Sequence, residues 1–113
     1  MTALDPDIQG PDRVREVFAR VHAGDNRVAD LYAEDGVVQV GGHEIQGREA
    51  IRAFYQRTID TIHPQPEVQE VLQSENLYIA VVHVPTDSGV QNAIDLFELG
   101  EDGIRRLVIF SRT

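Results

Sequence analysis

The chain has 113 residues, of which 42% are hydrophobic, enough for one domain with a single core. Its net charge of −9 argues against a nucleic acid or an anionic membrane as partner, because phosphate binding needs clustered basic residues. The absence of Cys excludes thiol catalysis, disulfides and Cys-based zinc sites. All ten basic residues are Arg, which excludes a lysine Schiff base.

No segment approaches the roughly 20 apolar residues of a membrane span. The first nine residues also lack the basic-then-apolar pattern of a signal peptide. We therefore expect a cytoplasmic protein with one domain over residues 1–113, in which residues 1–10 form a loose leader.

The first half of the chain predicts helices separated by short breaks. Pro11 suits the first turn of a helix, Asp25 can cap the helix that follows, and Gly41-Gly42 should break a short strand. Apolar residues recur at helical spacing before Gly24 and again after Gly47. The expected elements are a helix over 11–23, a short helix over 26–33, a turn at 34–36, a strand over 37–40 and a helix over 48–62.

The second half predicts a run of antiparallel strands. Its three connections are short and carry Asn or Gly, which is typical of hairpins. Helices followed by such a meander indicate an α+β fold with the helices on one face of the sheet. The expected strands cover residues 67–73, 77–85, 90–99 and 104–111.

Two of these strands are apolar on both parities, over residues 77–84 and 107–110. An antiparallel sheet with one wet face should instead alternate. Either the sheet curls tightly, or its outer face is covered by a second subunit. We favour a homodimer through the outer sheet face.

Asp95 lies in the apolar strand that begins at Asn92 and continues through Phe97. The residues around it are apolar on both faces, so its carboxyl should be buried. A buried carboxylate loses its hydration and must find hydrogen-bond partners or keep its proton. Asp95 therefore indicates a pocket, with a structural carboxyl satisfied by Tyr hydroxyls or backbone as the alternative.

Several strings in this order resemble the nuclear transport factor 2-like superfamily, and within it the ketosteroid isomerase and SnoaL-like group. The resemblance implies a conical α+β barrel, in which a curved, mainly antiparallel sheet wraps around the N-terminal helices and encloses a pocket (the cystatin-like fold). Such proteins are often dimeric. The matching strings are HAGD at 22–25, ADLYAEDGVV at 29–38, GREAIRAFY at 47–55 and AIDLF at 93–97.

The resemblance implies a divided active site. Ketosteroid isomerases use an aspartate base at the position of Val40 and a tyrosine donor at the position of Val17, and both are lost here. The second, protonated aspartate is matched by Asp95, and the supporting tyrosines by Tyr32 and Tyr55. A positioned base contributes roughly 10²–10⁴ in rate, so little steroid-isomerase activity should remain.

Other residues are candidates for the pocket wall or its rim. His83 and Arg106 could each face either the pocket or the outer surface of the sheet. The alternation along their strands does not decide which of these two faces each side chain is on. Ala93 stands where some epoxide-hydrolase relatives have Arg, which argues against their chemistry. With Val17, Val40 and Tyr32, the predicted ligand-binding residues are Phe54, Phe97, Val108 and Phe110.

We predict that the chain binds a lipophilic small molecule. If it is an enzyme, Asp95 and Tyr55 are the expected catalytic residues for a cofactor-free isomerisation, cyclisation or dehydration of a polyketide- or steroid-like substrate. The alternative is a non-enzymatic dimerisation or protein-interaction module with a vestigial pocket. No His pair has the spacing of a metal site, and no nucleotide fingerprint occurs, so no metal or cofactor is expected.

Overall fold

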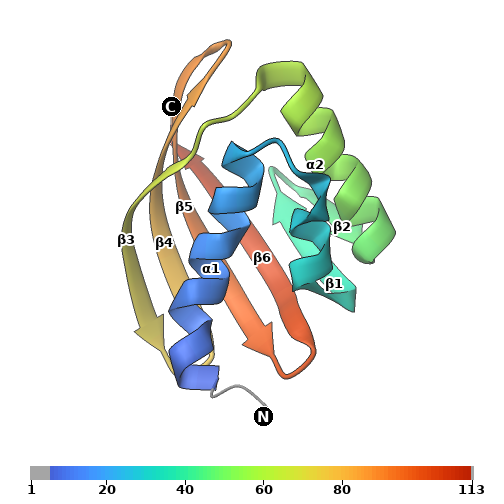
Figure 1. Ribbon diagram of the computed structural model, residues 1–113, viewed down its shortest axis with the longest axis vertical. Coiled ribbons are helices and arrows are strands. Elements are labelled where there is room, and N and C mark those ends of the chain that lie inside the picture. Colours follow the sequence, from blue (N-terminus) through green and yellow to red (C-terminus); the bar gives the residue numbers. More distant parts are fainter. Residues whose placement is uncertain (1–5, 113) are drawn as a thin grey trace.

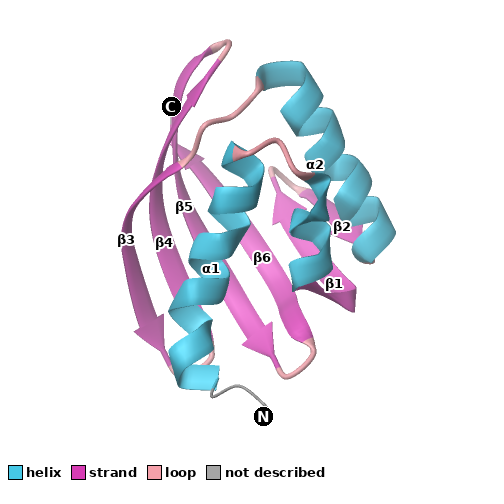
Figure 2. Ribbon diagram, in the orientation of Figure 1, coloured by secondary structure: helices cyan, strands magenta, loops and turns pink. Residues whose placement is uncertain are grey.

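A curved sheet with helices on its concave face forms the domain (Figure 1). The computed structural model describes residues 6–112. The six strands lie in the order β2-β1-β6-β5-β4-β3, and α1 and α2 cover one side of them (Figure 2). The predicted α+β fold is confirmed. The elements are α1 (Pro6–His22), the 3-10 helix η1 (Asn26–Leu31), β1 (Tyr32–Val40), β2 (His43–Gln46), α2 (Arg48–Ile62), β3 (Glu67–Ser74), β4 (Leu77–Thr86), β5 (Gly89–Gly100) and β6 (Gly103–Arg112).

The first helix begins earlier than the sequence predicts. It starts at Pro6 and contains Pro11 in its interior, so the expected leader over 1–10 is wrong from residue 6 onward, while residues 1–5 lie outside the described part. A Cβ atom at Gly10 would collide with the Tyr78 hydroxyl of β4. Gly10 therefore packs tightly against the sheet from within the helix, a tertiary contact that local sequence signals do not encode.

The helix after Asp25 is shorter than predicted. Asp25 caps it as expected, since its carboxylate accepts a hydrogen bond from the backbone N–H of Arg27. The helix is of the 3-10 type and stops at Leu31, because Tyr32 is already in extended conformation. The helix predicted over 48–62 is confirmed at both ends.

The first strand is longer than predicted and is joined to a strand that the sequence reading missed. The turn expected at 34–36 lies inside β1, at a register shift between Tyr32 and Val37 in the parallel pairing with β6. Gly41 and Gly42 have φ of 55° and 85°, the backbone that a tight hairpin turn requires. They lead into β2, whose four residues are mostly polar and therefore gave no strand signal.

The three C-terminal hairpins are antiparallel, as predicted. Cross-strand partners point to the same face of a sheet, so the pairing defines rows of side chains. One row crosses the concave face next to the helices. Its members, from β1 to β3, are Val40, Ile109, Asp95, Ala80 and Val71.

Gly103 is expected to be essential for the junction between η1 and β1. Its φ is 132°, and a Cβ there would lie 2.8 Å from the Ala33 nitrogen and 2.9 Å from the Leu31 carbonyl oxygen. Gly89 has a φ of 115° with no atom within 4 Å of such a Cβ. We expect Gly89→Ala to cost about 1–3 kcal/mol from backbone strain alone. Gly103→Ala should cost at least about 1 kcal/mol more, measured by urea denaturation. Equal losses would contradict the steric argument.

Candidate functional site

Asp95 is the buried acid of the concave face. Asp95 is 6% exposed. Its partners on the two adjacent strands, Ala80 and Ile109, are both apolar. Its Oδ1 atom is buried and has no hydrogen-bond partner among the described residues. This burial raises the pKa of Asp95 from 3.8 to about 7, because desolvation penalises the charged form.

A pair of buried phenols lies near this carboxyl. Tyr32 begins β1, Tyr55 lies on α2, and their hydroxyl oxygens are 2.6 Å apart. Burial is the main cause that raises the pKa of both phenols, and the negative charge of Asp95 raises both further. The Tyr–Tyr hydrogen bond uses one of the two hydroxyl hydrogens. The other O–H remains free to donate to Asp95 or to a ligand.

The two phenols hydrogen-bond to one another rather than to Asp95. The sequence-based alternative was a structural carboxyl satisfied by Tyr hydroxyls or backbone, and Oδ1 of Asp95 has neither kind of partner among the described residues. Tertiary pairing across 23 residues decides this arrangement, and no local pattern in the sequence could have revealed it.

Two of the residues predicted to contact a ligand lie in the hydrophobic core. Val17 and Phe97 are fully buried in the core, and Phe97 meets Phe18 edge-to-face at 5.8 Å. Phe54 packs edge-to-face on Tyr55 at 5.3 Å and is half-buried.

Val40 lies at the half-buried end of the Asp95 row. Ile109, which the sequence reading did not single out, lies between Val40 and Asp95. Along this row the residues change from half-buried at Val40 and Ile109 to fully buried at Ala80. Ile109 was missed because β6 is apolar on both parities, so its alternation does not mark the inner face.

The predicted placement of Val108 and Phe110 in the pocket is wrong. They pair with Leu96 and Ile94, which lie on the opposite face of β5 from Asp95. Phe110 is 53% exposed on that outer face. The inward residues of β6 are the alternate ones, Leu107 and Ile109.

Arg106 and His83 also lie on the outer face. Arg106 donates to the Gln39 side chain at 3.3 Å and is 3.9 Å from a Glu44 carboxylate oxygen. His83 is 3.0 Å from the Asn92 side-chain oxygen. Arg106 therefore has no contact that would hold Asp95 ionised. The described residues contain no cluster of three His, Asp or Glu side chains that could hold a metal ion.

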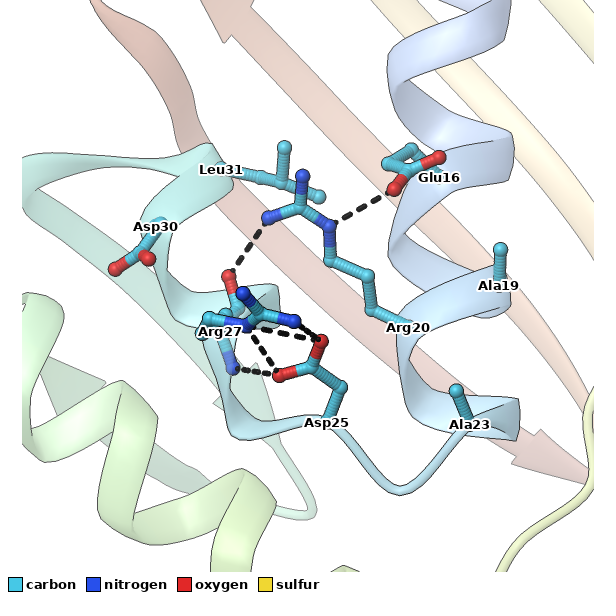
Figure 3. Close-up of a pocket in the computed structure, with 8 residues that line it drawn as sticks. All are labelled: Glu16, Ala19, Arg20, Ala23, Asp25, Arg27, Asp30 and Leu31. Carbon is cyan, nitrogen blue, oxygen red and sulfur yellow. Dashed lines mark hydrogen bonds and ion pairs between the residues drawn. The ribbon is translucent and has the colours of Figure 1, made fainter.

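A separate open groove of about 610 Å³ lies between α1 and η1 (Figure 3). Its charges are already paired, since Arg20 contacts Glu16 at 2.9 Å and Arg27 contacts Asp25 at 2.8 Å. The hydrogen bonds from Arg27 lower the pKa of Asp25 to about 2. The groove contains none of the predicted site residues and no unpaired buried acid. Its lining residues are Glu16, Ala19, Arg20, Ala23, Asp25, Arg27, Asp30 and Leu31.

The pKa of Asp95 makes stability depend on pH. Because the folded protein binds this proton more tightly than the unfolded chain, the stabilisation is fully present below about pH 3.8 and is lost as pH rises to about 7. The full effect is on the order of 4 kcal/mol. Asp95→Asn stays neutral, so its stability relative to wild type should rise by roughly 3 kcal/mol between about pH 5 and pH 8 in urea titrations. A stability difference between Asp95→Asn and wild type that stays constant with pH would contradict the burial argument.

Comparison with known proteins supports the fold. The SnoaL-like domain model matches residues 14–107. A protein from Sinorhizobium meliloti, provisionally assigned as a polyketide cyclase, is 21% identical with a TM-score of 0.82, over 91% of this chain and 97% of that one. A protein from Bacillus subtilis, provisionally assigned as an isomerase, is 18% identical with a TM-score of 0.84, over 96% and 90%.

The epoxide hydrolase/cyclase-like enzyme SalBIII, which has a role in pyran ring formation in salinomycin, is also 18% identical with a TM-score of 0.84, over 95% and 93%. At these identities the structural matches establish the fold alone. The comparison with curated proteins gives no significant match. No helix in the described residues is long and apolar enough to cross a membrane. The match over residues 14–107 shows that the chain belongs to the SnoaL-like domain family, with the nuclear transport factor 2-like fold.

Proposed function

We propose that this chain binds a lipophilic, oxygenated small molecule between α2 and the concave face of the sheet. Asp95 then acts as the acid or base in a cofactor-free isomerisation, cyclisation or dehydration of a polyketide- or steroid-like substrate. Tyr55 is the proposed second polar contact. The observation that carries the proposal is the buried, unpartnered Oδ1 atom of Asp95.

An unpartnered buried oxygen is costly, because it has given up water without a replacement. A ligand hydroxyl or carbonyl group at this position would restore the missing hydrogen bond. The protonated acid can donate to a carbonyl oxygen, and the carboxylate can accept a proton. With a pKa of about 7, both forms are populated near neutral pH, where a general acid or base is most effective.

The names of the structural relatives agree with this class of chemistry without establishing it for this chain. They include a provisional polyketide cyclase, a provisional isomerase and an epoxide hydrolase/cyclase-like enzyme. The proposed ligand-contacting wall consists of Val17, Tyr32, Val40, Phe54, Phe97 and Ile109. The cytoplasmic location stays a prediction.

The binding proposal is tested by a thermal-shift screen with steroids, aromatic phenols and polyketide fragments. A ligand at about 100 times its dissociation constant should add about 2.7 kcal/mol of stability. Asp95→Asn should weaken the binding of any hit by about tenfold or more, as expected when a charge-assisted hydrogen bond is lost. Asp12→Asn, the same substitution at an exposed position of α1, is the control and should bind any hit like wild type. Unchanged affinity and turnover in Asp95→Asn would contradict the proposed role.

A second candidate function, a dimerisation module, is favoured by the outer face of the sheet. There Leu72, Ile79 and Phe110 are 50%, 37% and 53% exposed. Leu72 and Ile79 continue across the strands into Leu96 and Val108 in one row. Monomeric proteins rarely expose a contiguous apolar patch of more than a few hundred Å².

A second copy of the chain is the occupant that we propose for this outer face. Each copy carries a net charge of −9, so two copies repel one another. An uncharged contact surface keeps acidic side chains of the two copies from being brought together in the interface. The row Leu72–Ile79–Leu96–Val108 carries no charge, and a twofold dimer buries the same patch on both subunits.

We expect a dimer at micromolar concentration by analytical ultracentrifugation. Phe110→Asp should shift it toward monomer, because a buried unpaired charge costs several kcal/mol at an interface. Ala53→Asp, which adds the same charge at an exposed position of α2, should leave the dimer intact. A clean monomer for the wild type would contradict this second candidate.

A further inference from the structure

Arg48 is the first residue of α2, a position that does not favour a cation. Helix N-termini carry a partial positive charge, so a guanidinium there is disfavoured unless another interaction offsets the cost. The N-cap, Gly47, makes no side-chain hydrogen bond to the helix. Helix formation therefore does not account for an arginine at this position.

The guanidinium of Arg48 makes hydrogen bonds outside its own helix. Its Nε and Nη2 atoms both donate to the backbone carbonyl oxygen of Tyr32, at 3.1 and 2.8 Å. Tyr32 joins η1 to β1, at the point where the pairing with β6 begins and then shifts register before Val37. Two charge-assisted hydrogen bonds thus hold an irregular point of the backbone.

Tyr32 is held at its other end by the same helix. Its hydroxyl is 2.6 Å from that of Tyr55, which follows Arg48 by about two helical turns. The contacts form a closed circuit from Arg48 to the Tyr32 carbonyl, through the Tyr32 ring to Tyr55, and back along α2. Any displacement of the Tyr32 backbone moves its phenol, and with it the hydroxyl pair near Asp95.

We propose that Arg48 is a positioning residue that orients the Tyr32–Tyr55 hydroxyl pair toward Asp95 by holding the Tyr32 carbonyl. The inference rests on the proposed function, in which the free phenol hydrogen contacts the ligand. Arg48 itself acts through Tyr32. Its role therefore differs from that of Arg52, which joins the same helix to η1 through Asp30 at 2.6 Å and the Asn26 carbonyl at 3.3 Å.

Arg48→Gln and Arg52→Gln form a matched pair, since both remove one charge and one tether between α2 and the η1 region. The readout is NMR of protein labelled with ¹³C at the tyrosine ζ carbon, with signals assigned from Tyr32→Phe and Tyr55→Phe. In wild type, both signals should titrate with a midpoint near the Asp95 pKa of about 7, because the carboxylate charge acts on both phenols.

Arg48→Gln should move both signals and reduce the amplitude of this titration, whereas Arg52→Gln should leave both as in wild type. Arg48→Lys keeps the charge but not the two-pronged geometry. Its tyrosine signals and their titration amplitude should lie between those of wild type and Arg48→Gln. A wild-type titration in Arg48→Gln, or an equal disturbance in Arg52→Gln, would overturn the inference.

The proposed function fails separately. Asp95→Asn should abolish the titration of the tyrosine signals whatever Arg48 does, and its effect on ligand affinity is measured in the thermal-shift screen. If Asp95→Asn binds ligand like wild type, the proposed function is overturned. The comparison of Arg48→Gln with Arg52→Gln still decides whether Arg48 positions the phenols.

Discussion

The cost of burying one carboxyl group governs the arrangement of this domain's interior. Asp95 has an apolar neighbour on each adjacent strand, and the strand arginine that could have neutralised it, Arg106, lies on the other face. The fold therefore leaves the Asp95 charge unpaired, and desolvation raises the pKa of Asp95 to about 7, so both protonation states are populated near neutral pH. Protonation removes the charge but leaves Oδ1 without a partner. What remains is a hydrogen-bonding position that a ligand, a water molecule or the free O–H of the Tyr32–Tyr55 pair can complete.

The elements around Asp95 converge on Tyr32. Its carbonyl receives Arg48, its hydroxyl meets Tyr55, and Gly103 lies so close to its backbone that a side chain does not fit. These contacts come from α2 and from the β5–β6 turn. A single residue at the η1–β1 junction thus couples the helix to the sheet, so the stability of the junction and the geometry of the phenols are determined together.

The sequence predicted those parts of the fold whose causes are local. The bounds of α2 follow from Gly47 before the helix and from Pro64 and Pro66 after it. The burial of Asp95 follows from the apolar residues around it in the strand. The helical part of α1 before Pro11 was not predicted, because it includes the tertiary contact between Gly10 and Tyr78, which local sequence signals do not encode. The inner face of β6 was misassigned because its residues are apolar on both parities, so only the cross-strand register separates Ile109 from Phe110. The pairing of Tyr32 with Tyr55 joins β1 to α2 across 23 residues, so it too depends on tertiary packing rather than on a local pattern.

Under the proposed function, the row Val40–Ile109–Asp95 limits the chemistry at Asp95. Val40 and Asp95 are separated by two strand spacings, about 10 Å, and the side chain between them is apolar. The Val40 position, where the resemblance to ketosteroid isomerases predicts a base, carries no ionisable group here. In the proposed function, Asp95 alone both gives and receives the proton, so the reacting atoms lie within reach of its two oxygens. The polar end of a ligand is then directed toward Asp95 and Tyr55, and its apolar body toward Val40 and Phe54. For the proposed function, a short-range proton shift or a ring closure initiated by one acid satisfies that geometry.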